Sequence, residues 1–378
     1  MSEASPIIQY FLSAQFFLAV LISVAFIPLL HRPAINLGLV DTPKGRKRHK
    51  ALVPLVGGPA IFLSIAISFY IWGLPAQFVG MAISATGLFI VGVIDDKKDI
   101  SPKLRLFIQA ALVSFALWWD NNWISEITVT SQLTLHLGLF KYIISVVAVM
   151  GVMNAINMLD GLDGLSAGVV LIILGFLIGI SVMAGAYDTS KVSICIFGAV
   201  LGFWIYNYRF KWREKAFVFL GDSGTTMLGF LLPVLAIKLS IVSPANAPKS
   251  VLLWLFAVPI WDICAVIIKR MRDKESPLQA RRDHIHHVLL NSGLSVRQSL
   301  HLIYLLTIAT ISFGMSIQFF SLTSLEAYVA FGVFLFAYLG RVGSLSQQTL
   351  ATVYDFKENG DRRKNEDSNI IQMNKRTK

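Results

Sequence analysis

Long apolar segments recur along this 378-residue chain, and they restrict the folds open to it more than any other feature. Runs of roughly 16 to 22 residues with few charges continue to about residue 340, and each could cross a bilayer as a helix. The chain is 55% hydrophobic and only 15% charged, which is more apolar sequence than a soluble core needs. We therefore predict an all-α polytopic integral membrane protein.

We predict eleven transmembrane helices, which make residues 1–340 one membrane domain. The first segment is long and lacks a small-residue cleavage site, so we interpret it as a retained span and not as a signal peptide. The tail, residues 341–378, is polar and basic, and we expect it to be disordered because it has little to bury. The predicted spans are 9–30, 56–73, 76–94, 104–119, 141–158, 165–183, 192–206, 225–242, 251–268, 301–320 and 325–340.

The basic residues predict the orientation of these spans. Alternate loops form two sets, and one set holds 29 of the 33 Lys and Arg residues: 31–55, 95–105, 159–164, 207–224, 269–300 and 341–378. Because cytoplasmic loops are enriched in Lys and Arg, we predict that this set is cytoplasmic and the N-terminus external. The polar clusters lie in or beside the same set, so an active site would face the cytoplasm.

Composition also limits the partners. The net charge of +11 does not indicate nucleic-acid binding, because the basic residues lie in loops between spans. Anionic lipid headgroups and phosphorylated substrates are better partners for such loops. The two cysteines, Cys195 and Cys264, lie inside apolar runs, where small buried side chains without a metal or disulfide role are expected.

The densest polar cluster directly follows an apolar segment. Asn154, Asn157, Asp160 and Asp163 are three residues apart, and each such step rotates about −60° on an α-helix. Glycines after Asp160 predict that the helix ends there and that the backbone turns. Converging oxygens at the end of a membrane helix are costly unless they hold something, and they suit Mg²⁺. A solvated loop with helix caps is the alternative.

A carboxylate pair, Asp95-Asp96, closes the third predicted span. Adjacent carboxylates repel each other unless cations offset them, so the pair predicts a position for a metal or a phosphate nucleophile. A solvated helix end is the alternative. Asp222 or Ser223, at the start of the eighth span, can cap that helix, whose N-terminus would favour phosphate; capping alone is the alternative explanation of Asp222.

Two basic loops complete the pattern. Residues 283–287 contain His284, His286 and His287 behind Arg281 and Arg282, which could donate hydrogen bonds to a pyrophosphate; a solvated basic loop and a zinc site are the alternatives. The loop at 41–50, with Lys44 and Arg46, could bind a phosphate or serve only as a topogenic positive loop.

The motifs occur in a fixed order that resembles a known family. They are Asp95-Asp96, Asn154-x-x-Asn157-x-x-Asp160-Gly-x-Asp163-Gly, Phe219-x-Gly-Asp222-x-Gly and His284-Ile-His-His287. In combination they strongly resemble the polyprenyl-phosphate N-acetylhexosamine-1-phosphate transferases, from about residue 30 to 340. The stretches 39–49 and 54–58 are most similar to the bacterial branch that uses N-acetylglucosamine. The His-Ile-His-His form favours that branch over the one acting on the muramoyl pentapeptide, which has His-His-His.

The resemblance implies a reaction at the bacterial inner membrane. An undecaprenyl phosphate would attack the β-phosphorus of UDP-N-acetylglucosamine, releasing UMP and starting O-antigen or another cell-surface polysaccharide. Mg²⁺ would be the cofactor, and Mn²⁺ could substitute for it. Direct attack is favoured over an aspartyl-phosphate intermediate, because both substrates can reach one cytoplasmic site.

The resemblance also implies roles for particular residues. Asp95, Asp96, Asp160 and Asp163 would be catalytic, and Asp222 and Asn157 would hold Mg²⁺. The implied and inferred substrate-binding residues are Phe219, which would stack on uracil, with His284, His286, His287, Arg281, Arg282, Lys44, Arg46 and Asn154. A phosphate monoester is largely ionised at pH 7, so a general base is optional and Asp95 could be a base or only hold the cation.

Other functions remain open at this level. A UDP-sugar of the fucosamine, quinovosamine or galactosamine type would use the same motifs. A secondary transporter would need charged or broken-helix features near mid-span, where Lys238, towards the outer end of its span, is the main candidate. A scaffold that recruits glycan enzymes through its basic loops would not depend on Asp222.

Overall fold

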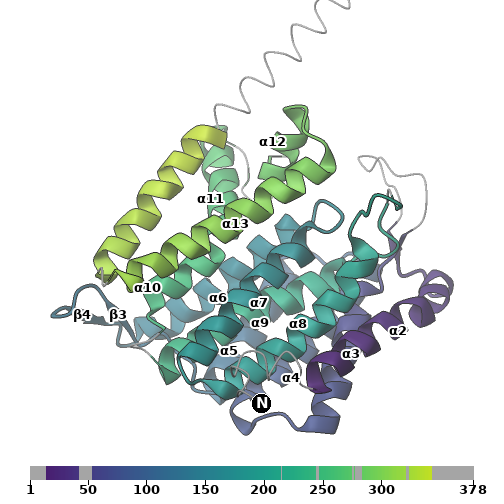
Figure 1. The fold of residues 1–378 in the computed structure, drawn as a ribbon, viewed down its shortest axis with the longest axis horizontal. Coiled ribbons are helices and arrows are strands. Elements are labelled where there is room, and N and C mark those ends of the chain that lie inside the picture. Colours follow the sequence, from purple (N-terminus) through teal and green to yellow (C-terminus); the bar gives the residue numbers. More distant parts are fainter. Residues whose placement is uncertain are drawn as a thin grey trace, which may run out of the picture.

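The computed structural model describes residues 14–41, 53–213, 215–243, 247–274, 276, 283–320 and 323–342. These residues form a bundle of helices with two short strand pairs (Figure 1). The predicted tail at 341–378 lies outside the described residues from position 343 onward, so its disorder stays a prediction.

Helices account for nearly all of the described structure. They are α2 (Ala14–Asn36), α3 (Gly57–Trp72), η1 (Ala76–Phe78), α4 (Val79–Lys98), α5 (Pro102–Trp119), α6 (Phe140–Leu159), α7 (Leu165–Met183), α8 (Tyr187–Asn207), α9 (Gly221–Val242), α10 (Lys249–Leu252), η2 (Leu253–Phe256), α11 (Ala257–Arg272), α12 (Ile285–Asn291) and α13 (Val296–Phe319). A last helix spans Ser324–Val342. The strands pair antiparallel, β1 (Val40–Asp41) with β2 (Val53–Pro54) and β3 (Glu126–Thr128) with β4 (Thr134–His136).

Each predicted span coincides with a helix, which confirms the all-α polytopic membrane fold. Within the described residues, nine helices are long and apolar enough to cross a membrane, and α3 is a shorter apolar helix of 16 residues. Some boundaries differ from the prediction. Helix α2 continues to Asn36 although it contains Pro28 and Pro33, and α8 begins at Tyr187, before the predicted start at 192. The short helix α12 and the strands were not predicted.

Local capping signals fix several helix ends as expected. Ser101 accepts a hydrogen bond from the Leu104 N–H, with proline at the first helical position of α5. Ser295 and Gln298 form a capping box at the start of α13. Helix α6 ends at Leu159, so the predicted turn after the Asn-x-x-Asn segment is confirmed.

Helix α9 is the centre of the bundle. In its apolar stretch 83% of the residues are buried, against 17% for both α2 and the last helix, which leave their apolar side chains for lipid. Glycines let its neighbours approach closely: a Cβ on Gly58 of α3 would lie 2.5 Å from the Ser223 hydroxyl, and one on Gly92 of α4 would lie 2.3 Å from the Ser223 Cα. The start of α9 is therefore fixed by backbone packing.

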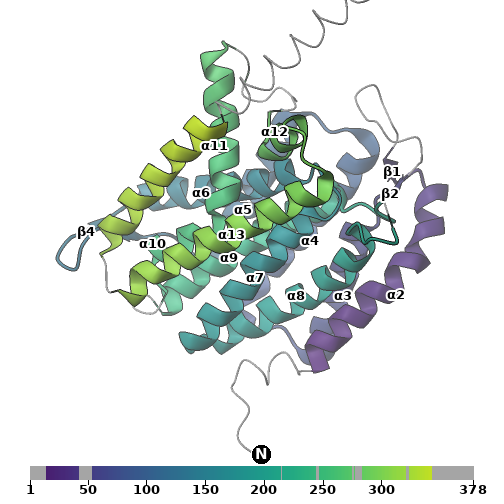
Figure 2. The ribbon, with the colours of Figure 1, turned by 45° about the horizontal axis from the view of Figure 1, so that its top comes forward.

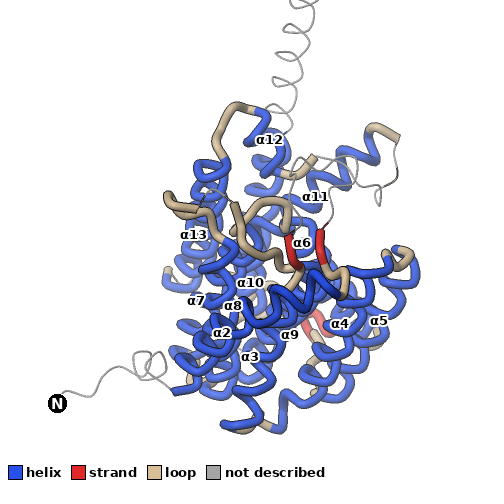
Figure 3. Tube along the Cα trace, turned by 90° about the vertical axis from the view of Figure 1, so that its right-hand side faces the viewer, coloured by secondary structure: helices blue, strands red, loops and turns tan. Residues whose placement is uncertain are grey.

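The two ends of the bundle differ in structure. The β3–β4 hairpin lies at one end, whereas α12 and the β1–β2 pair lie toward the other (Figures 2 and 3). The start of α9, the end of α4 and the end of α6 all lie at the α12 end, which is called the site end below.

Candidate active site

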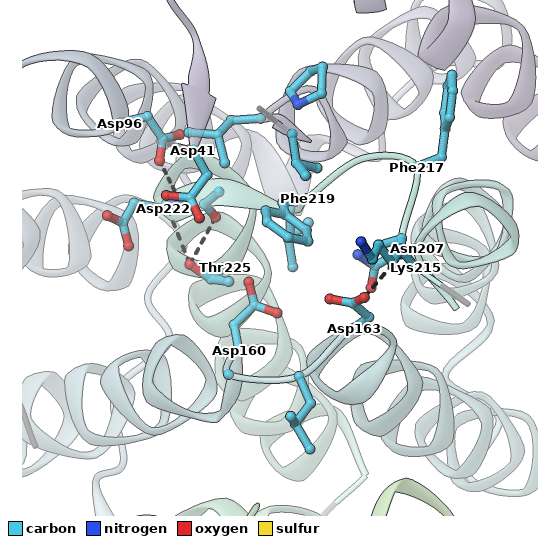
Figure 4. Close-up of a pocket in the computed structure, with 18 of the residues that line it drawn as sticks. Asp41, Asp96, Asp160, Asp163, Asn207, Lys215, Phe217, Phe219, Asp222 and Thr225 are labelled. Carbon is cyan, nitrogen blue, oxygen red and sulfur yellow. Dashed lines mark hydrogen bonds between the residues drawn. The ribbon is translucent and has the colours of Figure 1, made fainter. Parts of the chain in front are cut away.

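A large cavity opens at the site end, with a volume of about 1780 Å³. All five internal loops of the basic set contribute residues to its lining, which confirms that these loops share one side of the bundle. In Figure 4, Asp160 points toward Asp222 and Thr225, Asp163 points toward Asn207 and Lys215, and Phe219 lies between the two groups. Residues far apart in sequence thus converge on one space.

Asp222 lies in the first turn of α9, and its carboxylate faces the end of α6. The Asn157 Nδ2 donates hydrogen bonds to the Asp222 Oδ1 and to the Thr225 Oγ1, both at 2.7 Å. Because the amide nitrogen is engaged there, the Asn157 carbonyl oxygen points away from both groups. The two residues predicted as metal neighbours are therefore in direct contact.

Asp96 caps α9, which corrects the prediction that Asp222 or Ser223 would do so. The helix begins at Gly221 and has no side-chain cap of its own. The Asp96 carboxylate accepts hydrogen bonds from the N–H groups of Asp222, at 2.7 Å, and of Ser223, at 3.2 Å. These N–H donors, which were expected to bind phosphate, already bind a carboxylate from α4.

Asp95 is buried and engaged on both oxygens. Its Oδ2 forms an ion pair with the Arg105 Nη1 at 2.9 Å, and its Oδ1 accepts the Ile100 N–H at 2.7 Å. The two members of the predicted pair therefore differ: Asp95 ties α4 to α5, and Asp96 ties α4 to α9.

Asp163 is also neutralised by a guanidinium group. Its Oδ2 accepts a hydrogen bond from the Arg209 Nε at 2.7 Å and one from the Ala216 N–H at 3.0 Å. The segment after α8 is thereby held against the turn after α6.

Asp160 has no such partner. It lines the cavity at the end of α6, and no Lys or Arg among the described residues forms an ion pair with it, with Asp96 or with Asp222. Burial raises the pKa of Asp160 to about 7, and the negative charges of Asp222, Asp163 and Asp96 contribute to the rise. The centre of the cavity thus carries more negative charge than its described surroundings compensate.

Phe219 projects into the cavity from a short extended segment before α9. Its N–H donates to the Pro54 carbonyl at 3.0 Å, and its carbonyl accepts the Gly57 N–H at 2.9 Å. This backbone pairing with the segment between β2 and α3 presents an aromatic face beside the carboxylates, as the predicted stacking on a base requires.

The histidines of the predicted substrate loop do not all reach the cavity. His287 lines it, whereas His284 and His286 are buried outside the lining. The His284 Nδ1 lies 2.8 Å from the Asp262 Oδ2. Burial, with the charges of His287 and His284, holds the pKa of His286 well below its usual value, so its ring is neutral.

Other predicted residues lie elsewhere. The Asn154 side chain donates to the Met150 carbonyl within α6 and is not part of the lining. Lys44, Arg46, Arg281 and Arg282 lie outside the described residues, so their predicted roles stay predictions.

The donor set fits Mg²⁺ better than zinc. In the described part of the chain no three His, Cys, Asp or Glu side chains lie close enough together to hold a metal ion by themselves, neither at the histidines nor at the carboxylates. The Asp222 and Asp160 carboxylates and the Asn157 carbonyl are oxygen donors, and Mg²⁺ is commonly held by one or two carboxylates together with substrate phosphates.

Sequence reasoning missed several residues of the site. Asn207 is buried at the end of α8; its Oδ1 accepts the Gly164 N–H at 2.7 Å, and its Nδ2 donates to the Val218 carbonyl at 2.8 Å. It therefore joins the Asp163 turn to the Phe219 segment. Its place at the end of an apolar span, in a loop of the basic set, was the available signal. Further lining residues that were not predicted are Lys97, Arg209, Lys215, Thr225 and Arg297.

The sequence matches a known family and is similar to known proteins that share one name. Residues 78–240, which include all five site aspartates but not the histidines, match the model of glycosyl transferase family 4. The chain is similar to proteins named undecaprenyl-phosphate alpha-N-acetylglucosaminyl 1-phosphate transferase from three bacteria. It is 31% identical over 326 residues to that of Yersinia pestis (84% of this chain and 87% of the relative). It is 32% identical over 324 residues to that of Haemophilus influenzae (83% and 90%). It is 35% identical over 326 residues to that of Pasteurella multocida (83% and 89%).

Proposed function

This chain belongs to glycosyl transferase family 4, the family of polyprenyl-phosphate N-acetylhexosamine-1-phosphate transferases, and on that premise we propose that it moves a sugar-1-phosphate from a UDP-N-acetylhexosamine to undecaprenyl phosphate. The sugar is N-acetylglucosamine, and the product, undecaprenyl-diphospho-N-acetylglucosamine, begins O-antigen or another cell-surface polysaccharide. The names of the relatives and the sequence at 39–49 and 54–58 support this choice over fucosamine-, quinovosamine- or galactosamine-type substrates.

One observation carries the proposal: three carboxylates without a cationic partner among the described residues face a cavity beside an aromatic ring. Asp96, Asp160 and Asp222 concentrate negative charge where Phe219 can take a base. Phosphoryl transfer depends mainly on positioning and charge neutralisation, and a nucleotide diphosphate brings its own oxygens to a shared cation.

Mg²⁺ fits this site, where the Asp222 and Asp160 carboxylates would hold it; the Asn157 side chain turns its amide nitrogen toward Asp222, so its carbonyl oxygen would join them only after the amide rotates. When bound, the cation would offset the negative charge on the diphosphate oxygens and so make the β-phosphorus easier to attack. The chain's own residues fix the ligands: Asn157 orients Asp222, and Asp96 fixes the turn of α9 that carries Asp222.

The reaction is a direct displacement. An oxygen of the lipid phosphate forms a bond to the β-phosphorus, the bond from that phosphorus to the bridging oxygen breaks, and UMP leaves. The lipid phosphate is largely ionised at pH 7, so no base is needed. Asp95 would have to break its ion pair with Arg105 to accept a proton, so we assign it to positioning α4.

The chain is a multi-pass membrane protein, and we place the site on the cytoplasmic face of the bacterial inner membrane. The basic loops converge at the site end, which supports a cytoplasmic cavity and an external N-terminus. UDP-sugars are made in the cytoplasm, so both substrates would meet at this surface.

The test uses purified full-length protein in detergent with undecaprenyl phosphate, Mg²⁺ and a panel of radiolabelled UDP-sugars. Label should move into an organic-extractable lipid from UDP-N-acetylglucosamine, and transfer should be lost with Asp222→Asn and with chelator. Transfer only from another UDP-sugar would keep the mechanism and change the substrate. No transfer from any sugar by well-folded protein would overturn the enzyme and favour transport or scaffolding.

A further inference from the structure

Asp262 is a buried carboxylate that the proposed reaction does not use. It lies in α11, is not among the residues that line the cavity, and is only 3% exposed. A carboxylate inside a membrane-spanning helix is costly unless specific partners satisfy it. Its partners therefore indicate why it is there.

All the hydrogen bonds that Asp262 accepts come from the C-terminal third of the chain. Its Oδ2 lies 2.8 Å from the His284 Nδ1, and its Oδ1 accepts the Ile285 N–H at 2.8 Å. The Tyr338 hydroxyl of the last helix donates to the same Oδ1 at 3.2 Å. One carboxylate thus joins α11, the start of α12 and the last helix, which lie together at the site end (Figure 2).

The histidine rings continue from this carboxylate toward the cavity. The His284 and His286 rings are stacked, with centroids 5.8 Å apart and an interplanar angle of 5°. The His286 and His287 centroids are 4.2 Å apart, and His287 lines the cavity. A displacement of His284 would therefore reach His287 through two ring contacts.

The middle histidine also packs against the catalytic turn. A Cβ on Gly161 would lie 2.1 Å from the His286 Nε2, so the ring occupies the space where a side chain would be. His286 is buried, and its Nδ1 has no hydrogen-bond partner in the described structure. The His286 ring is thus placed by packing against Gly161 and not by a hydrogen bond at Nδ1. Gly161 directly follows Asp160.

From these contacts we propose that Asp262, supported by Tyr338, is a positioning residue for the nucleotide-sugar site. It holds His284 as an anchor, His286 acts as a spacer against Gly161, and His287 alone reaches the substrate. The three histidines thus have different tasks. The inference rests on the proposed function only in taking the ligand of His287 to be the sugar-linked diphosphate.

The first test is a double-mutant cycle on KM and kcat for the UDP-sugar, with Asp262→Asn, His287→Ala and the double variant. Asp262→Asn keeps the shape but replaces the acceptor that faces His284, so it should raise KM about 10-fold with a smaller change in kcat. In the His287→Ala background it should change KM less than about 2-fold, because the residue it positions is absent. An unchanged KM, or an effect of full size in both backgrounds, would overturn the proposal.

Asp120→Asn is the matched control, since Asp120 is also buried and accepts two backbone N–H bonds, but at the hairpin end. It should leave KM unchanged. If Asp262→Asn does not fold, Gly161→Ala displaces His286 directly and should show the same dependence on His287. Tyr338→Phe, which removes one donor, should raise KM about 2- to 3-fold; no coupling in either variant would contradict the proposal.

A second readout needs no activity. Reaction with diethyl pyrocarbonate, mapped by mass spectrometry, should be slow at His284 and His286 in the wild type and several-fold faster in Asp262→Asn. The exposed His136 should react equally in both proteins. Unchanged protection would overturn the positioning role, whereas failure of turnover in the wild type alone would count only against the proposed function.

Discussion

Two aspartates cap helix starts at opposite ends of the bundle, and their surroundings differ: Asp120 caps α4, and Asp96, which lies in α4, caps α9. At the hairpin end, Asp120 accepts two N–H groups at the start of α4, at 2.9 and 2.7 Å. At the site end, Asp96 accepts two N–H groups at the start of α9, at 2.7 and 3.2 Å. The local hydrogen bonding is the same, so any difference in role comes from what surrounds each carboxylate.

The neighbours of Asp120 partly offset its charge. Burial raises the pKa of Asp120, and the two N–H groups and the ammonium of Lys238 oppose that rise. Lys238 also donates to the Asp120 carbonyl at 3.5 Å. The residue that suggested a transport pathway is therefore half of a structural pair.

The neighbours of Asp96 do not offset its charge. Asp222 and Asp160 add negative charge, and no described Lys or Arg pairs with these three carboxylates. Because Lys238 partly offsets the charge of one cap and no described cation offsets the other, the excess charge at the site end supports the proposed binding of a cation and a phosphorylated substrate there.

The largest expected effect is at Asp96, and the same Asp-to-Asn substitution at Asp120 is its control. Asp96→Asn should lower kcat/KM about 10²- to 10³-fold, because it disturbs the turn that carries Asp222 and removes a charge from the site. Asp120→Asn should stay within about 2-fold. Lipid-linked label is the measurement, with thermal unfolding as a check on folding. Equal losses in the two variants would mean that the caps do not differ in role.

Addition of Mg²⁺ should stabilise only a site with its carboxylates intact. At about 100 times the dissociation constant, binding adds about 2.7 kcal/mol to the unfolding free energy. Thermal unfolding midpoints with and without Mg²⁺ should rise for the wild type and for Asp120→Asn, but not for Asp222→Asn. A similar rise in all three would place the cation elsewhere.

The pH dependence of stability should report the excess charge without any ligand. Burial raises the pKa of Asp160 to about 7 in the folded state, above its ordinary value of 3.8, so between these values the folded state holds more protons than the unfolded state. Stability in chelator should therefore be highest at low pH and fall as pH rises to about 7, by at most about 1.4 kcal/mol per unit.

Unfolding midpoints between pH 5 and 8 measure this dependence. In Asp160→Asn the fall in stability with rising pH should be smaller. Asp120→Asn should keep the part of the fall that comes from Asp160. A fall that is identical in wild type and Asp160→Asn would assign it to other groups.

The smallest effect is expected for Lys238, at the hairpin end. Lys238→Met replaces a half-buried ammonium with an apolar side chain of similar shape, so it should change stability by about 1 kcal/mol or less. Its transfer activity should remain within about 2-fold of wild type. A large loss of activity would show that the hairpin end takes part in function.

Particular residues show how far sequence reasoning reaches. The end of α6 after Leu159 and the capping box of α13 followed from local signals, because turn and cap chemistry involves neighbours in sequence. The cap of α9 was assigned wrongly, because the acceptor is Asp96, which lies 126 residues before the donor, Asp222. Asn207 was missed for the same reason, since both of its partners lie in other segments.

The sequence by itself determined that this chain crosses a membrane many times and that its polar motifs lie in loops of one basic set. Apolar run length and charge asymmetry act locally against the bilayer, so they can be recognised without a fold. Only the tertiary structure decided which carboxylates are neutralised. Asp95 and Asp163 meet arginines, whereas Asp96, Asp160 and Asp222 meet one another, because helix packing brings charges together that the sequence keeps apart.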